Sequence, residues 1–202
     1  MRKNLLALSI AAMVGGLSGA ANAAVLNGNG TTTTTATRLL INPQGVGHIL
    51  TVPYFSTQGN NKTLLSITNT DTTNGKAVKL RFRGAANSDD IFDITVYLSP
   101  GDVWTADVAA DGDISRLVTN DTSCTLPSAQ DIKDLGGKFK TNRVQGNAAA
   151  QTREGYVEIL NMADIPPGAV DTAGRNVANP LYGAIKHVAG KAPCDAAVIQ
   201  AA

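Results

Sequence analysis

The feature that most constrains the fold is an alternation of apolar and polar residues between Leu64 and Gly84, interrupted by an Asn/Asp/Gly-rich turn. A period of two is typical of a β-strand, whose successive side chains point to opposite faces. In the second half of this segment, Lys79, Arg81 and Arg83 fall on one face and the apolar residues between them on the other. The segment therefore predicts a hairpin-like pair of strands with one buried face.

The same pattern recurs along the chain, with turn residues between the repeats. Seven segments are expected to be strands: residues 48–55, 62–69, 76–83, 91–98, 102–108, 114–118 and 155–160. No helical period lies between them, which argues against a fold of alternating strands and helices. The sequence predicts an all-β fold, an immunoglobulin-like β-sandwich of about seven or eight strands.

Two stretches depart from the alternation. Residues 128–135 are expected to form a short helix that Ser128 caps and two glycines end, with Asp131 in the first turn. The C-terminal tail is Ala-rich and expected to be partly helical, whereas the polar interval 138–152 is expected to be mobile. The expected organisation is a signal peptide (1–23), a flexible Thr-rich leader (24–37), a β-sandwich domain (38–161), and a loop with a partly helical tail (162–202).

The first 23 residues have the pattern of a secretory signal peptide: a basic start at Arg2 and Lys3, an apolar stretch, and the small-residue site Ala21-Asn22-Ala23. The apolar stretch is too short to span a bilayer. We expect export to the extracellular surface, cleavage after Ala23 and no transmembrane segment in the mature chain. The alternative is an uncleaved anchor or a buried helix.

Within the Thr-rich leader (residues 24–37), residues 27–37 lack bulky apolar side chains and cannot offset their ordering entropy by burial. The segment is expected to be a flexible leader. The alternative is an extended arm that adds a strand to a neighbouring subunit, because Thr favours β-structure.

The net charge of the chain indicates which partners it can bind, and its cysteine content indicates the state of those cysteines after export. The whole chain has 17 Lys and Arg against 16 Asp and Glu, and the signal peptide contains two of the basic residues and none of the acidic ones. The mature chain is therefore close to neutral, which argues against nucleic acid as a partner. In an exported chain the two cysteines, Cys124 and Cys194, are expected to form a disulfide. The alternatives are two free thiols or an intermolecular bridge.

Catalytic signatures are not found in the sequence. There is no P-loop, GxSxG or GxGxxG motif, and the two histidines, His48 and His187, have no standard zinc spacing. We expect a protein that is not an enzyme and needs no cofactor. Asp107, Asp111 and Asp113 are weak candidates for a calcium site, but Asp111 and the following glycine also form a strong hairpin-turn signal.

The basic stripe, which we define as Lys76, Lys79, Arg81 and Arg83, has two interpretations. It is either the solvated face of a sheet or a contact surface for an anionic partner. Three aspartates at 89, 90 and 93 lie on the next expected strand and would neutralise the stripe across the hairpin. The single tryptophan, Trp104, alternates with small apolar residues and is expected in the core rather than on a carbohydrate-binding surface.

Two resemblances add to these expectations. Residues 67–71 ("ITNTD") and 98–102 ("LSPGD") resemble parts of immunoglobulin-like domains of pilus chaperones and related bacterial sandwiches, over Leu64 to Val108. The segments "GVGHILTVPYFSTQGNNKTLLSITNTD", "FDITVYLSPGDVWTA", "SCTLP" and "REGYVEIL" are similar to exported bacterial proteins described only as cell-surface proteins. That likeness implies a location and no chemistry.

Together these features predict an exported, surface-associated, non-catalytic binding or structural protein of a bacterial cell envelope. Its expected partner is a surface or matrix component, and self-association is compatible with the sequence. The alternative is a subunit of an extracellular fibre that assembles by strand addition. A secreted hydrolase ranks third.

The mature N-terminus is expected to be Ala24, because the basic start, apolar stretch and small-residue site all place cleavage after Ala23. Intact-mass measurement of the exported protein tests this. An exported product that still carries Met1 would contradict it.

Overall fold

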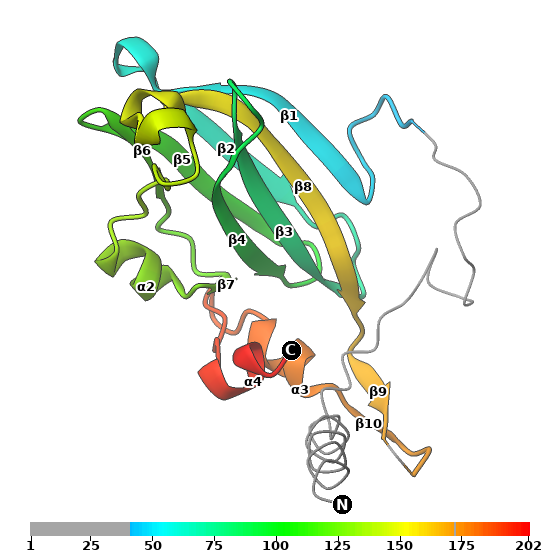
Figure 1. Ribbon diagram of the computed structural model, residues 1–202. Helices are drawn as coiled ribbons and strands as arrows, with labels where there is room; N and C mark the ends of the chain where they lie inside the picture. Colours follow the sequence, from blue (N-terminus) through cyan, green and yellow to red (C-terminus); the bar gives the residue numbers. More distant parts are fainter. Residues whose placement is uncertain (1–40, 172) are drawn as a thin grey trace, which may run out of the picture.

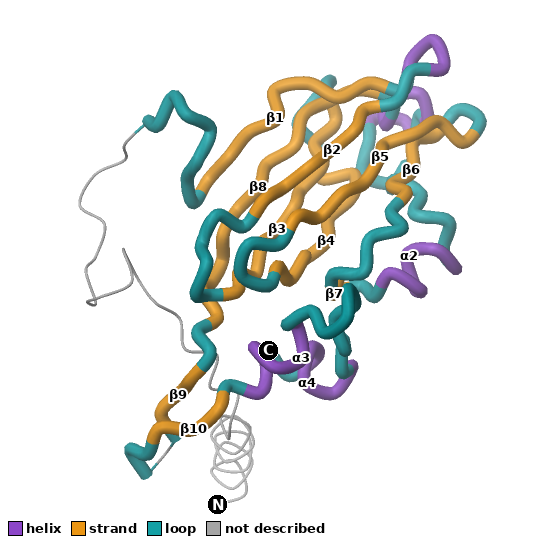
Figure 2. The backbone as a smooth tube through the Cα atoms, turned by 180° about the vertical axis from the view of Figure 1, so that it is seen from behind, coloured by secondary structure: helices purple, strands orange, loops and turns teal. Residues whose placement is uncertain are grey.

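The computed structural model describes residues 41–171 and 173–202, so the predicted signal peptide and leader lie outside the described residues. The chain forms two antiparallel sheets, one of five strands in the order β1-β8-β3-β4-β7 and one of three in the order β2-β5-β6 (Figure 1). The three-stranded sheet lies over the five-stranded sheet when the molecule is seen from behind (Figure 2). The prediction of an all-β sandwich is therefore confirmed at the level of architecture.

The strands of the two sheets are β1 (Ile49–Ser56), β2 (Thr63–Thr68), β3 (Gly75–Gly84), β4 (Asp90–Leu98), β5 (Val103–Asp111), β6 (Ile114–Val118), β7 (Cys124–Leu126) and β8 (Glu154–Ile165). A separate hairpin joins β9 (Gly168–Val170) and β10 (Asn176–Ala178). The helices are α2 (Ala129–Asp134), α3 (Pro180–Ile185) and α4 (Ala196–Gln200), with 3₁₀ turns η1 (Gln58–Asn60), η2 (Gln145–Asn147) and η3 (Ala149–Thr152).

Strand β3 is at the centre of the five-stranded sheet, with β4 on one side and β8 on the other. Its alternation has the predicted consequence: Val78, Leu80 and Phe82 are buried in the main core, and the basic residues between them face away from it. Trp104 on β5 faces the same core and is fully buried, as expected. The two-residue period thus fixes which face of each sheet is inside.

An aromatic cluster fills one end of this core. Phe139 makes edge-to-face, tilted and stacked contacts with the other three phenylalanines of the chain, at centroid distances of 5.1 to 5.9 Å. Phe139 comes from the interval 138–152, which the sequence led us to expect as polar and mobile. That expectation was wrong, because Phe139 and Val144 are both buried in the core. Two isolated apolar side chains have no periodicity that would reveal them.

The same interval closes one side of the sandwich. The Phe139 N–H donates to the Ser115 carbonyl on β6 at 2.9 Å, and the Lys140 N–H donates to the Ile91 carbonyl on β4 at 2.6 Å. These two consecutive residues therefore hydrogen-bond to both sheets. On the opposite side, β1 and β2 are the last strands of their sheets among the described residues.

The predicted helix at 128–135 is present as α2. Ser128 and Asp131 form a reciprocal capping box, and the glycines at 136 and 137 follow with positive φ. Three features were missed: the short strand β7, the β9–β10 hairpin, and the extension of β8 to Ile165, beyond the expected domain boundary at residue 161. The extension follows from pairing, since Asp164 and Ile165 continue the ladder with β3.

The C-terminal helices pack against the end of the five-stranded sheet near β7, in both ribbon views (Figures 1 and 2). A second apolar cluster joins Leu181, Ile185 and Ile199 of these helices to Ala77 and Tyr97 of the sheet. The tail is therefore part of the folded structure, and its helices are stabilised by this contact rather than by their own short length.

Replacing Phe139 with Ala is expected to lower the free energy of unfolding by about 3–5 kcal/mol, because it leaves a cavity among three aromatic rings. The matched control is Lys140→Ala, whose exposed side chain is lost while its backbone hydrogen bond stays; about 0.5 kcal/mol or less is expected. Urea unfolding measures both. Equal losses would show that Phe139 does not fill the core.

Candidate functional site

Lys79, Arg81 and Arg83 of the basic stripe lie on the outer face of the five-stranded sheet, whereas the register with β4 places Lys76 on the opposite face at the start of β3. Each of the four cations has an acidic partner. Lys79 pairs with Asp93, and Arg81 Nη2 lies 2.8 Å from Asp90 Oδ2. The register explains these contacts, because β4 brings its aspartates opposite the stripe. The hydrogen bond to Asp90 raises the pKa of Arg81 above its usual value.

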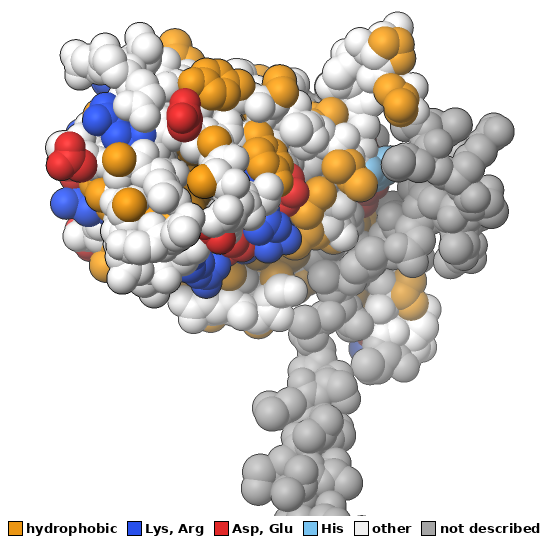
Figure 3. Space-filling model, turned by 45° about the horizontal axis from the view of Figure 1, so that its top comes forward, with side chains coloured by type: hydrophobic (Ala, Val, Ile, Leu, Met, Phe, Trp, Pro, Cys, Tyr) orange, Lys and Arg blue, Asp and Glu red, His pale blue; other side chains and the backbone are white. Residues whose placement is uncertain are grey.

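Strand β8 and the turn before β3 supply the other partners. Arg83 Nε lies 3.1 Å from Glu158 Oε2, and Lys76 Nζ lies 2.7 Å from Asp164 and 2.9 Å from Asp71. The sequence predicted Asp89, Asp90 and Asp93 as partners; Asp90 and Asp93 are, whereas Asp89 forms no ion pair with the described residues. The sequence missed Glu158, Asp164 and Asp71. Cations and anions consequently lie next to each other on the visible surface (Figure 3). The stripe is a row of ion pairs rather than a uniformly cationic patch.

The three calcium candidates do not come together around one point. Asp107 Oδ2 lies 3.3 Å from Lys62 Nζ, and Asp111 Oδ2 lies 3.2 Å from Lys138 Nζ. Asp113 follows Gly112 in the β5–β6 hairpin turn, where that glycine has a φ of 63°. Within residues 41–171 and 173–202, no group of three or more His, Cys, Asp or Glu side chains is arranged for a metal ion.

Cys124 and Cys194 are bonded to each other, with Cα atoms 5.3 Å apart, as the sequence predicted. The bond joins β7 to the segment just before α4 across a sequence separation of 70 residues. It fastens the C-terminal helices to the edge of the five-stranded sheet. A loop of this length corresponds to about 4 kcal/mol in the chain-entropy model.

A polar cluster next to this bond contains His187. Its Nδ1 lies 3.0 Å from Ser99 Oγ and 3.5 Å from Asp102 Oδ2, and its Nε2 lies 3.3 Å from Thr122 Oγ1. The β4–β5 turn, the loop after β6 and the tail thus meet at one imidazole. The sequence gave no indication that His187 has partners 65 to 88 residues away.

The cluster contains the residue types of a hydrolytic triad, but its distances and hydrogen bonds differ from those of one. A triad places the carboxylate on one imidazole nitrogen and the nucleophile on the other. Here Ser99 is closer to Nδ1 than Asp102 is, and the Thr122 hydroxyl donates to the Gly190 carbonyl at 3.0 Å. The arrangement holds the tail against the sandwich, and we call it the histidine latch.

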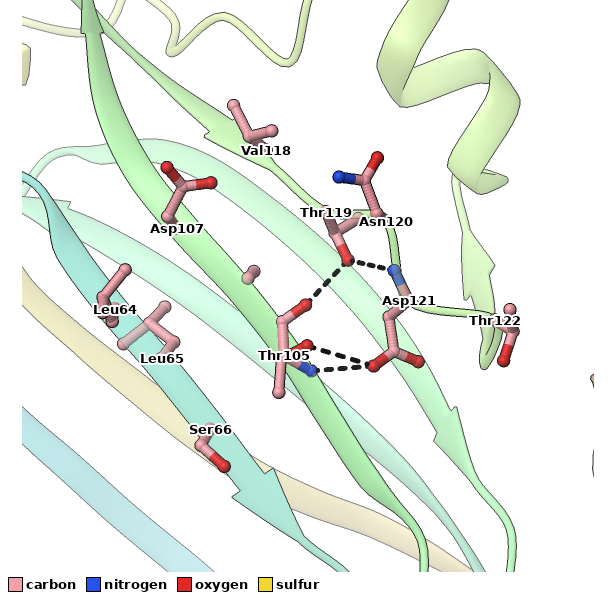
Figure 4. A pocket seen from close by; sticks show the side chains of 11 residues that line it. Leu64, Leu65, Ser66, Thr105, Asp107, Val118, Thr119, Asn120, Asp121 and Thr122 are labelled. Atoms are coloured by element: carbon pink, nitrogen blue, oxygen red, sulfur yellow. Dashed lines mark hydrogen bonds between the residues drawn. The ribbon is translucent and has the colours of Figure 1, made fainter. Parts of the chain in front are cut away.

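A hollow of about 690 Å³ lies over β2, β5 and the loop that follows β6 (Figure 4). Strand β6 ends at Val118, and its backbone pairing with β5 ends there too. Beyond this point, side chains of the following loop form the hydrogen bonds to β5. Asp121 Oδ2 accepts from the Thr105 N–H at 3.0 Å, and Thr119 Oγ1 donates to the Thr105 carbonyl at 2.8 Å. These bonds hold the loop beside β5 and form one wall of the hollow.

The side chains around the hollow can form hydrogen bonds and one apolar contact. Asp107 offers a carboxylate, several Ser and Thr residues offer hydroxyls, and Leu64 is 79% exposed. A carboxylate and hydroxyls bind ligands that carry hydroxyl, amide or ammonium groups. Sequence patterns did not indicate this site, because its walls come from three separate segments.

Comparison of the chain with models of protein families, with curated proteins and with solved structures finds no match. Across the described residues, no helix has the length and apolar character needed to cross a membrane. What the protein does is therefore inferred from the contacts of its own side chains.

Asp71 provides a pH test of the ion-pair network. Burial alone would raise the pKa of this carboxyl, but hydrogen bonds from the N–H groups of Asn74 and Thr73, together with Lys76, outweigh it and hold the pKa well below its usual range. A lowered folded-state pKa stabilises the fold above the unfolded pKa of about 4, and this contribution is lost as the pH falls through the folded-state value.

We therefore expect Asp71→Asn to lower the free energy of unfolding by about 1–2 kcal/mol at pH 7. The difference from wild type is expected to shrink progressively below about pH 4. Asp113→Asn, at an exposed turn position, is the control and should show no such difference. Denaturant unfolding between pH 7 and pH 2 measures this, and a pH-independent difference would contradict it.

Proposed function

We propose that the protein is an exported, surface-associated, non-catalytic binding or structural protein of a bacterial cell envelope. The hollow over β2 and β5 is the observation that carries this proposal. Its walls present a carboxylate, hydroxyls and an exposed leucine, held in place by the bonds between Asp121, Thr119 and Thr105. A rigid polar surface of this kind is suited to holding a surface or matrix component that carries hydroxyl or amide groups.

Two features support export. The N-terminal sequence has the pattern of a signal peptide, and the bond between Cys124 and Cys194 belongs to a class that persists in oxidising compartments. The resemblance of several segments to bacterial cell-surface proteins agrees with that location.

We further propose that the sandwich is of immunoglobulin-like type. The order β2-β5-β6 corresponds to the C-F-G sheet of that fold, and the intervening β3–β4 hairpin corresponds to strands D and E. The five-stranded sheet departs from the plan in two ways, because β8 is inserted between β1 and β3, and because β3 rather than β4 lies on the side of β1, whereas strand E lies next to strand B in the immunoglobulin fold.

The fibre alternative has β1 and β2 in its favour, since each ends its sheet in the described part of the chain. An arm formed by residues 24–37 would then add a strand to a neighbour. A chain beginning at Ala36 is expected to elute in gel filtration like the full mature chain. A polymer that forms only with the arm would favour the fibre.

The hydrolase alternative rests on the histidine latch. A screen of ester, glycoside and peptide substrates is expected to show no turnover. Turnover that is lost in Thr122→Ala would show that this hydroxyl is a nucleophile and would overturn the non-catalytic proposal.

Binding is tested with purified bacterial cell envelopes and the labelled mature protein. Asp107→Asn is expected to weaken binding by about tenfold, because the hollow loses one of its two carboxylates while Asp121 stays bonded to Thr105. Asp111→Asn is a matched control, since it changes the same residue type on the same strand, also paired with a lysine, outside the hollow. Absence of binding, or equal weakening by both changes, would contradict the proposed site.

A further inference from the structure

Within the described residues, strand β2 is a sheet edge without protection against pairing. Its six residues, Thr63–Thr68, contain no proline and no charged side chain, and its ladder with β5 runs without a bulge. The neighbouring edge strand β1 differs, because it contains Pro53 and a register shift between Val52 and Phe55. Proline, charge and bulges are the usual means of preventing pairing between sheet edges. Only the β1 edge of this pair has such protection.

The register shows which backbone groups of β2 point outward. The Asn69 N–H donates to the Asp102 carbonyl at 2.8 Å, in the same register that pairs Ile67 with Trp104. Hydrogen-bonded pairs alternate along an antiparallel ladder. The odd-numbered residues of β2 therefore bond to β5, and the N–H and C=O groups of Leu64, Ser66 and Thr68 point to the free edge.

An independent contact supports this assignment. The Thr105 N–H donates to Asp121 on the far side of β5, so it does not bond to its β2 neighbour Ser66. In the described part of the chain, β5 is the strand paired with β2. The side chains of Leu64, Ser66 and Thr68 are also exposed.

We propose that β2 pairs antiparallel with β2 of a second copy of this chain, about a two-fold axis at Ser66. This register places Ser66 opposite Ser66 of the second copy, and Leu64 opposite its Thr68. All three exposed side chains of each strand then have a cross-strand partner, and the outward N–H and C=O groups form hydrogen-bonded pairs. The two three-stranded sheets become one continuous sheet.

The charges around the axis are compatible with this pairing. Lys62 lies opposite Thr70 of the second copy, so no like charges meet across the ladder. Shifting the axis to Leu65 would place Leu64 opposite Ser66 and leave Thr68 opposite Lys62, which gives a poorer match of side chains. Neither register brings like charges together, so side-chain complementarity alone favours the Ser66 axis.

Such a contact is isologous, so it closes as a dimer and does not propagate into a fibre. It goes beyond the proposed binding function and does not depend on it. Leu64 and Ser66 also line the hollow, so pairing would place two hollows on one face of the joined sheet. Two sites on one particle raise avidity for a repetitive surface.

Ser66→Cys tests the register directly. Opposite residues in a hydrogen-bonded pair have Cα atoms about 5.5 Å apart, within disulfide range. Mild oxidation of the mature protein is expected to link two Ser66→Cys chains. Thr68→Cys is the matched control on the same edge and face; its two copies would be about 13 Å or more apart and should not link. Equal linking of both variants, or of neither, would overturn the proposal.

Sedimentation equilibrium tests the association itself. The mature protein is expected to be a dimer at about 100 µM, a concentration at which weak transient contacts are populated. Ser66→Pro removes an N–H that faces the free edge and spares the ladder with β5, so it is expected to be a folded monomer. Should that variant fail to fold, Ser66→Lys places like charges across the axis and is expected to be monomeric too. A monomeric wild type, a long polymer, or a dimer that survives these changes would overturn the proposal.

Discussion

Residues 137–140 cross from the three-stranded sheet to the five-stranded sheet and hold the two together. Phe139 places its ring among the other three phenylalanines, while its N–H and that of Lys140 bond to β6 and β4. Apolar burial and backbone pairing are therefore satisfied by the same two residues. This crossing closes one side of the sandwich, and on the opposite side β1 and β2 are the last described strands of the two large sheets.

Local periodicity was enough to predict the sandwich. Strands such as β3 and β5 have one face in the core, so their two-residue alternation identifies both the strand and its buried side. The same reasoning failed at β7 and at residues 138–152. Strand β7 has only three residues and is held by the bond between Cys124 and Cys194, and Phe139 is an isolated apolar residue in a polar interval. Neither contains a repeat long enough to show a period.

The sites, like the strands, could be predicted where they depend on neighbouring segments and not where they depend on distant ones. Asp90 and Asp93 were predicted as partners of the basic stripe because a hairpin brings neighbouring strands into register. Glu158 and Asp164 were not predicted, because β8 is far from β3 in the sequence and no local pattern shows that the two strands pair. The histidine latch and the hollow depend on contacts between separate segments. Apart from the cysteine pair, which the count of two cysteines identified, the sequence predicted contacts between side chains only where they lie on one hairpin.

The asymmetry between the two sides of the sandwich links the fold to the proposed roles. One side is closed by Phe139 and Lys140 and reinforced by the tail, whose disulfide and histidine latch cover the end near β7. The other side carries the regular β2 edge, and the hollow opens beside it. The disulfide and the histidine latch hold the tail against the end of the sandwich near β7, while the β2 edge stays exposed on the opposite side. Contacts with a surface component or with a second copy are therefore both expected on the β2 side, where backbone groups and exposed side chains have no partner within the described fold.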